Sequence, residues 1–172
     1  MRIILVGKAA SGKDFYRDYV AKTQRLDVSY TTRPIRDGEE DGYTYNFLTE
    51  AKFNEMAEKG QFFENVKFNG WSYGTSMQSW NHNSIFIMTP SGVKQIPTED
   101  RAECIVVYFD IDEEVRKARL STRSDADKTK RRLRADLLDF KGFNDFDIRV
   151  RNPLFNPIVV SKLIKEYSHT CG

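Results

Sequence analysis

A glycine-rich turn between an apolar run and a helical pattern constrains this chain more than any other feature. Gly7, Gly12 and Lys13 belong to the segment GKAASGKD, which follows the apolar residues 3–6 and opens a helical pattern over 14–22. The segment fits the pattern G-x-x-x-x-G-K. Glycines let successive N–H groups point inward, and a helix N-terminus adds partial positive charge. The spacing predicts a phosphate-binding loop whose lysine bridges the outer phosphates of a nucleotide. An ordinary strand-to-helix turn would not need the lysine at this offset.

Asp14 stands where such loops usually carry Ser or Thr. The usual hydroxyl binds Mg²⁺, and a carboxylate is also a good ligand for a hard cation. An acid in the first turn of a helix is favourable for a second reason, because it complements the helix dipole. Both interpretations of Asp14, a Mg²⁺ ligand and a helix-start residue, stay open on the sequence.

Short apolar runs place this loop in an α/β fold. Residues 3–6, 85–88 and 105–109 are β-branched or aromatic and lack a polar face, as is typical of parallel strands covered on both sides. Helical patterns accompany them at 14–22, 50–59, 113–123, 128–140 and 157–167. We therefore expect a parallel β-sheet flanked by helices.

The pattern of polar and apolar residues changes between residues 25 and 75. Aromatic and apolar residues alternate there with polar ones, and Gly, Asp and Asn mark the turns. Residues 62, 64, 66 and 68 would share one strand face. This pattern predicts a small antiparallel sheet set into the α/β core.

Composition narrows the function classes. The chain has 172 residues, 27 Lys plus Arg, 25 Asp plus Glu and a formal net charge of +2. That balance excludes attachment to nucleic acid or membrane by bulk charge alone. No apolar run approaches the ~20 residues of a transmembrane helix, and two cysteines with two histidines do not suit a disulfide framework or a zinc site. We expect a single cytoplasmic domain with no nucleic-acid or membrane partner.

A second group of polar residues follows the glycine loop. Arg33 and Arg36 lie amid hydroxyl residues in the segment SYTTRPIR, which suits a second phosphate site. Glu64 shares a strand face with apolar neighbours. A carboxylate there is either an exposed misfit or the polar anchor of a pocket, where it would accept from two adjacent N–H donors such as a guanine ring edge.

Taken together, these motifs resemble the guanylate kinase family over nearly the whole chain. The family pattern runs S-x-T-T-R-x-x-R, G-E-x-x-G-x-x-Y, F-x-E and Y-G-[ST], in that order. The matching residues are Ser29, Thr31, Thr32, Arg33 and Arg36; Gly38, Glu39, Gly42 and Tyr45; Phe62 and Glu64; and Tyr73, Gly74 and Thr75. A plain polar sheet surface would not reproduce this order and spacing.

The resemblance implies two nucleotide sites. For GMP, it implies that Glu64 accepts from guanine N1–H and the 2-amino group, that Thr75 donates to O6, and that hydroxyls and arginines hold the phosphate. The implied GMP-binding residues are Ser29, Arg33, Arg36, Tyr45, Glu64, Tyr73, Gly74, Thr75 and Thr89. The implied ATP-binding residues are Gly7, Lys8, Ala9, Ala10, Ser11, Gly12, Lys13, Asp14, Arg119 and Asn152, with Mg²⁺ as cofactor and Asp14 as its candidate ligand.

Residues 116–134 carry nine basic residues against two acids. Such a run is usually a solvated face or a nucleic-acid patch, but no aromatic residue interleaves it before Phe140. It resembles the lid of guanylate kinases, R-L-x-x-R followed by a helix with R-L. By that resemblance the catalytic residues would be Lys13, Arg33, Arg123 and Arg132, although Arg131 could take the place of the last.

One stretch departs from the family pattern. The family carries D-x-D-x-x-G after the strand that corresponds to residues 85–88, and here Ile87 and Thr89 replace both acids. Base contacts and Mg²⁺ placement are therefore open. We hypothesise that Asp14 has taken over metal positioning, with Asp110 as a weaker candidate.

The sequence thus predicts a nucleoside monophosphate kinase of the P-loop kinase fold, which transfers the γ-phosphoryl group of ATP to GMP or dGMP as a monomer or homodimer. The expected parts are a core (1–28, 76–115 and 141–172), a monophosphate lobe (29–75) and a helical lid (116–140). A related P-loop kinase for another nucleotide or a phosphorylated sugar, and a non-catalytic protein-interaction module, are the alternatives.

Overall fold

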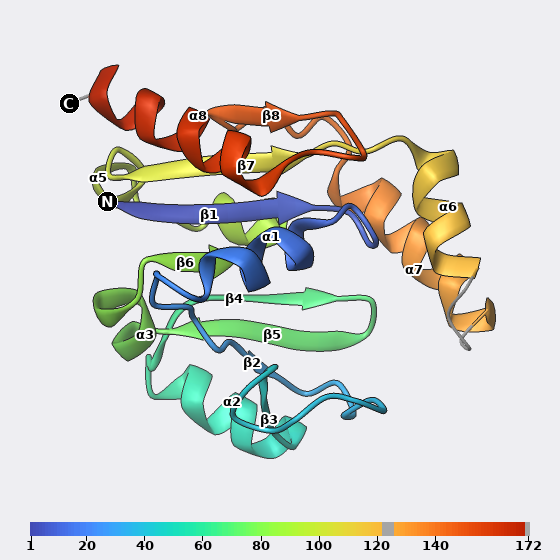
Figure 1. The fold of residues 1–172 in the computed structure, drawn as a ribbon. Helices are drawn as coiled ribbons and strands as arrows, with labels where there is room; N and C mark the ends of the chain where they lie inside the picture. The colour runs from blue at the N-terminus through green and yellow to red at the C-terminus, as the bar shows by residue number, and fades with distance from the viewer. Residues whose placement is uncertain (122–125, 171–172) are drawn as a thin grey trace.

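The computed structural model describes residues 1–121 and 126–170, apart from the side chains of 126–132. Its centre is a parallel sheet of four strands in the order β6-β1-β7-β8, formed by β6 (Ile85–Ile87), β1 (Arg2–Gly7), β7 (Cys104–Phe109) and β8 (Ile148–Val150). Ile4 lies beside both Phe86 and Val106. The interior position of β1 brings the glycine loop to the middle of the carboxyl edge of the sheet (Figure 1).

The parallel sheet is buried on both faces, which explains why its strands lack polar alternation. On one face Leu5 and Val107 pack with Tyr16 of α1 (Lys13–Val20) and Val160 of α8 (Pro157–Thr170). On the other face, the core includes Ile4, Val6, Phe86 and Val106, together with Trp80 and Val93 from neighbouring helices and Phe140, which directly follows a helix. Neighbouring residues of β1 supply both cores because their side chains alternate between the faces.

A second sheet of four strands lies alongside β6, below the parallel sheet in Figure 1. Its order is β3-β2-β5-β4, formed by β3 (Asn46–Phe47), β2 (Tyr30–Thr31), β5 (Trp71–Ser76) and β4 (Phe62–Phe68). The expected antiparallel pairing is present between β4 and β5 and between β5 and β2. The short β2–β3 pair is parallel, so the sheet is mixed.

The β4–β5 hairpin presents the functional face that the alternation of residues 62–68 predicts. Its two-residue turn, Asn69-Gly70, has φ angles of 53° and 84°, as in the type I′ turns that suit hairpins. Glu64 is buried, whereas its neighbours Asn65 and Lys67 are exposed. A bulge between Phe62 and Glu64 shifts the register by one residue.

The predicted helices are confirmed with small changes at their ends. The remaining ones are α2 (Glu50–Glu58), α6 (Glu113–Ser121) and α7 (Ala126–Asp139). Three short helices lacked a readable period in the sequence: α3 (Met77–His82), α4 (Pro90–Val93) and α5 (Thr98–Arg101). Figure 1 shows α6 and α7 side by side, beyond the carboxyl ends of β1 and β7. None of the helices in the described ranges has the length and apolar character needed to cross a membrane.

Candidate active site

The glycine loop runs from the end of β1 to the start of α1 and is shaped by close approaches. A Cβ on Gly7 would lie 2.5 Å from the Ser11 hydroxyl oxygen, so a larger residue there would displace the loop. Gly12 has φ 93° and faces the Phe155 ring, which would lie 3.0 Å from an added Cβ. Ala10 also has a positive φ, 59°. Ser11 is fully buried, and its hydroxyl has no hydrogen-bond partner among the described residues.

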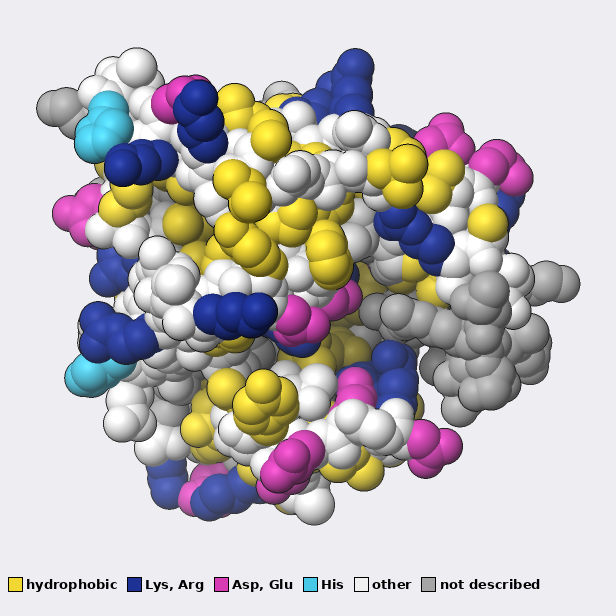
Figure 2. Space-filling view, in the orientation of Figure 1, with side chains coloured by type: hydrophobic (Ala, Val, Ile, Leu, Met, Phe, Trp, Pro, Cys, Tyr) yellow, Lys and Arg dark blue, Asp and Glu magenta, His cyan; other side chains and the backbone are white. Residues whose placement is uncertain are grey.

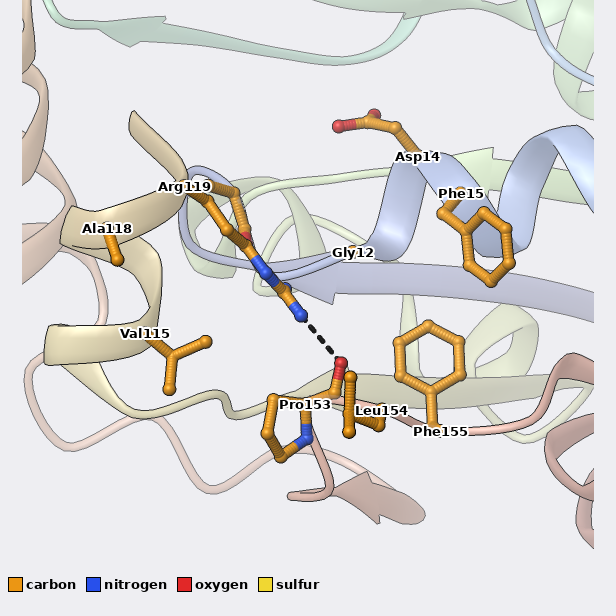
Figure 3. Close-up of a pocket in the computed structure, with 10 residues that line it drawn as sticks. Gly12, Asp14, Phe15, Val115, Ala118, Arg119, Pro153, Leu154 and Phe155 are labelled. Carbon is orange, nitrogen blue, oxygen red and sulfur yellow. Dashed lines mark hydrogen bonds between the residues drawn. The ribbon is translucent and has the colours of Figure 1, made fainter. Parts of the chain in front are cut away.

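A cavity of about 1030 Å³ opens beside this loop (Figure 3). Arg119 of α6 crosses its wall, where its guanidinium donates to the carbonyl of Ala10 at 3.0 Å and to that of Pro153 at 2.6 Å. The rings of Phe15 and Phe155 lie 5.9 Å apart on the opposite side. The lining residues are Ala10, Gly12, Asp14, Phe15, Val115, Ala118, Arg119, Pro153, Leu154 and Phe155. This combination of loop amides, one cation and apolar walls suits a nucleotide with a planar base.

Asn152, expected beside ATP, stabilises a turn that forms one wall of this cavity. Its side-chain oxygen accepts from the backbone N–H of Leu154 at 2.9 Å. The bond holds the turn that carries Pro153, Leu154 and Phe155 into the cavity. The sequence motif pointed to the asparagine, whereas the side chains that face the cavity come directly after it.

Lys13 and Asp14 begin α1. The Lys13 ammonium is largely buried and lies 3.6 Å from the Asp14 carboxylate, whose side chain is 55% exposed. Gly12 occupies the N-cap position, so Asp14 lies in the first turn and is not the N-cap residue. A carboxylate there still complements the helix dipole.

Arg33 is fixed in the small-sheet region by an ion pair with Glu39. Its two terminal nitrogens donate to the two Glu39 oxygens at 2.9 and 2.7 Å, and one of them also donates to the Pro34 carbonyl. The guanidinium lies 5.5 Å from the ring centres of both Tyr45 and Phe47. Burial alone would raise the pKa of Glu39, but the bonds and charge of Arg33, helped by the Arg36 N–H, lower it. Glu39 is therefore ionised and orients Arg33.

Tyr45 and Tyr73, two other residues expected at the monophosphate, lie beside this pair. The rings of Tyr45 and Tyr73 lie 6.0 Å apart, which brings both phenols to the side of Arg33. Arg36 is exposed, and its backbone N–H donates to Glu39. The Ser29 hydroxyl donates to Asp27, a half-buried carboxylate that also accepts from Ser79. Burial raises the pKa of Asp27.

Glu64 and Thr75 face each other across β4 and β5. One Glu64 oxygen accepts from the Thr75 backbone N–H at 3.1 Å and from its hydroxyl at 2.9 Å. Burial raises the pKa of Glu64 to about 7, although the two bonds from Thr75 oppose the shift. The second Glu64 oxygen lies close to Gly92 of α4, where an added Cβ would come within 2.9 Å of it. Gly74 likewise packs closely, because a Cβ there would meet the Phe62 ring at 2.8 Å.

Thr89 caps the helix next to this carboxylate. Its hydroxyl accepts from the Gly92 N–H at 3.2 Å, and Pro90 occupies the first turn of α4. Thr89 thereby orders the short helix that places Gly92 against Glu64. Ile87, the other residue at an expected acid position, is half-buried in β6.

The described arginines of α6 turn toward the glycine loop. Arg116 is 2% exposed and Arg119 is half-buried, so Arg116 does not belong to a solvated basic face. Arg123 lies outside the described residues, and so does the side chain of Arg132.

Comparison with known proteins identifies the family. Residues 1–167 match the model of a family described as guanylate kinase. The chain belongs to the guanylate kinase family. A guanylate kinase of Prochlorococcus marinus is 32% identical over 162 residues, which cover 87% of this chain and 88% of that one. A guanylate kinase of Methylobacillus flagellatus is 31% identical over 139 residues, or 76% and 69% of the two chains.

The fold is that of a solved guanylate kinase as well. The crystal structure of the enzyme from Anaplasma phagocytophilum superposes with a TM-score of 0.73 at 16% identity and covers 98% of this chain and 85% of that one. The resemblance read from the sequence motifs and the predicted α/β fold are therefore confirmed.

A family that uses ATP generally uses Mg²⁺, and the residues near the glycine loop fit such an ion. Mg²⁺ usually keeps several waters and takes one or two carboxylates plus substrate phosphates. Asp14 offers one accessible carboxylate at the edge of the glycine loop. The described part of the chain holds no group of three or more His, Cys, Asp and Glu side chains that could bind a metal. These residues suit a Mg²⁺ ion that arrives with a nucleotide.

Four charged residues in and around the candidate site carry no role predicted from the sequence: Asp27, Glu39, Arg116 and Asp136. Glu39 was matched to the family motif but not paired with Arg33. Arg116 and Asp136 are buried, Asp27 is half-buried, and none of the three lies in a motif that names its partner. The only sequence signal for Arg116 and Asp136 is that each is a charged residue on a helix face that also carries apolar residues.

Proposed function

We propose that this chain transfers the γ-phosphoryl group of ATP to GMP or dGMP, releasing ADP and GDP or dGDP. The observation that carries the guanine assignment is Glu64, a buried carboxylate held in place by Thr75 on the small sheet. Family membership supports the reaction type, and the cavity beside the glycine loop supports ATP as the donor.

Glu64 suits guanine for a chemical reason. An ionised carboxylate accepts from guanine N1–H and the 2-amino group. The Thr75 hydroxyl donates to Glu64 in this structure and would turn its hydrogen to O6 when guanine binds. Adenine has an acceptor at N1 and no 2-amino group, so it would leave Glu64 unpaired in a buried site. Gly92 leaves room for the carboxylate, Gly74 leaves room for the Phe62 ring, and Thr89 contributes by ordering α4.

The phosphate of the acceptor nucleotide would be bound by Arg33, Arg36, Tyr45 and Tyr73, with Ser29 at the edge of the site. Arg33 is the anchor, since Glu39 holds its guanidinium in one orientation. The contacts within the described residues use three of its five N–H groups, which leaves donors for a phosphate oxygen.

ATP would lie along the glycine loop. The backbone N–H groups at the start of α1, those of residues 12–14, and the Lys13 ammonium would bind its phosphates. Arg119 and the apolar side chains beyond Asn152 would enclose the base. We assign Asp14 to the Mg²⁺ ion that comes with the nucleotide; this ion would neutralise negative charge on the nucleotide phosphates.

The transfer itself needs positioning more than covalent chemistry. Lys13 and Arg33 would hold the two nucleotides in line, and the lid arginines Arg123 and Arg132 would stabilise charge on the transferring group. No general base is required, because the acceptor phosphate is already anionic. The lid, over 116–140, would exclude water from the γ-phosphoryl group.

A coupled ADP-release assay across the common ribo- and deoxyribonucleoside monophosphates tests this function. We expect turnover with GMP, dGMP or both, and little with AMP, CMP, UMP or TMP. Turnover of AMP or TMP without turnover of GMP would contradict the guanine assignment. The ratio of the turnover rates with GMP and dGMP, measured in the same assay, establishes the sugar preference.

A further inference from the structure

We propose that Arg116 and Asp136 are positioning residues that hold the phosphate loop in its nucleotide-binding shape. They lie on different helices, α6 and α7, and both contact the same peptide segment of the loop, at Ala9. The proposal rests on the proposed function, because it treats the loop as the ATP site.

Asp136 binds the loop directly. One of its carboxylate oxygens accepts from the backbone N–H of Ala9 at 2.8 Å, and the residue is 4% exposed. The two residues are 127 positions apart in the chain. A charge-assisted hydrogen bond that is shielded from water in this way is among the stronger ones in a protein.

Arg116 completes the clamp from α6. Its guanidinium donates to the Ala9 carbonyl at 3.4 Å and to the Ile111 carbonyl at 3.1 Å, and it lies 3.8 Å from the same Asp136 oxygen that binds Ala9. At 2% exposure it is among the most buried large side chains of the protein. The N–H and the carbonyl of Ala9 are thus both held by buried, oppositely charged groups.

The contact at Ala10, the next residue of the loop, shows which backbone groups this clamp orients. Arg119, one turn further along α6, donates to the carbonyl of Ala10, which has a left-handed φ of 59°. A loop that binds phosphate must turn its N–H groups toward the ligand and its carbonyls away from it. Arg116 and Arg119 bind two successive carbonyls, and Asp136 fixes the peptide that precedes them.

Packing alone does not require this ion pair. Burying two charges costs solvation, and apolar residues of similar volume often stabilise a core as well or better. A buried pair whose members both bind one functional loop is better explained by the geometry that it imposes. Loss of that geometry should weaken ATP binding and slow turnover, because small displacements of a catalytic group are costly.

Two double variants separate positioning from stability. In Arg116→Met/Asp136→Leu the pair becomes apolar, so the fold keeps its packing but Ala9 loses its acceptor. In Arg116→Met/Asp136→Asn the pair is also neutral, but the Asn oxygen can still accept from the Ala9 N–H. Asp147→Asn is the matched control, because Asp147 accepts from the Val106 N–H and pairs with Arg101 before the start of β8.

Calorimetric titration with the β,γ-imido analogue of ATP measures the effect, and thermal melting reports stability in the same samples. We expect the Leu variant to bind about tenfold more weakly than wild type, and the Asn variant to recover part of that loss. The control should melt earlier yet bind within about twofold of wild type, because it lies away from the loop. Turnover should fall more in the Leu variant than in the Asn variant.

Equal binding by wild type and the folded Leu variant would overturn the proposal. Hydrogen exchange of the wild-type protein tests it without any substitution: the Ala9 amide should be protected in the absence of nucleotide, and fast exchange there would also overturn it. A wild-type protein that does not bind the analogue at all would instead contradict the proposed function.

Discussion

Glu64 and Thr75 form a two-point contact across β4 and β5, in which one carboxylate oxygen accepts from both the backbone N–H and the hydroxyl of Thr75. The second oxygen is directed to the space beside Gly92. The carboxylate is therefore oriented before a ligand arrives, which reduces the cost of binding.

Replacing Glu64 tests base recognition. Glu64→Gln keeps the size of the side chain but offers one acceptor and an amide donor to a ring edge that needs two acceptors. We expect kcat/KM for GMP to fall by about 100-fold or more. Glu55→Gln, at a partly exposed glutamate on α2, is the control and should leave the kinetics unchanged. Wild-type kinetics in Glu64→Gln would show that Glu64 does not read guanine.

The same carboxylate should make stability depend on pH. Burial raises the pKa of Glu64 to about 7 from 4.5, so between these pH values the folded protein holds a proton that the unfolded chain has released. The contribution of Glu64 to stability is complete below pH 4.5 and is lost as pH rises through 7. Urea unfolding at pH 5 and pH 7.5 should show that wild type loses up to about 3 kcal/mol more than Glu64→Gln does. A parallel change in both proteins would contradict the shift.

Arg33→Lys tests the phosphate anchor. A lysine keeps the charge but cannot bond Glu39 in the two-pronged manner that orients the guanidinium. We expect the KM for GMP to rise by roughly 10-fold, with the KM for ATP little changed. Arg101→Lys provides a matched control. Arg101 also pairs with carboxylates, but it lies beside Cys104 at the start of β7, away from the small sheet. An equal rise in both KM values would argue for a general loss of folding.

Asp14→Ala tests the metal assignment. If Asp14 binds Mg²⁺ directly or through water, the Mg²⁺ concentration for half-maximal activity should increase several-fold, roughly 3- to 10-fold. Asp18→Ala on the same helix is the control, because Asp18 is exposed and pairs with Arg17. Unchanged Mg²⁺ dependence in Asp14→Ala would leave Asp14 as a residue that only complements the helix dipole.

Local patterns in the sequence were sufficient for the α/β fold, the glycine loop and the order of the nucleotide motifs. Residues 3–6 and 105–109 are apolar without alternation because both faces of their sheet are covered. Such an uninterrupted apolar run can be recognised directly in the sequence. The G-x-x-x-x-G-K spacing is equally local. Glu64 could be singled out because a single carboxylate interrupts an apolar strand face.

Only the tertiary structure decided which charges meet. Glu39 binds Arg33 through a turn, Thr75 holds Glu64 across a hairpin, and Asp136 reaches Ala9 over 127 residues. The same holds for the parallel β2–β3 pair and for Arg116, which the charge run suggested was solvated but which is buried. Charge is a property of single residues and is readable in sequence, whereas its solvation and its partner depend on how distant segments pack.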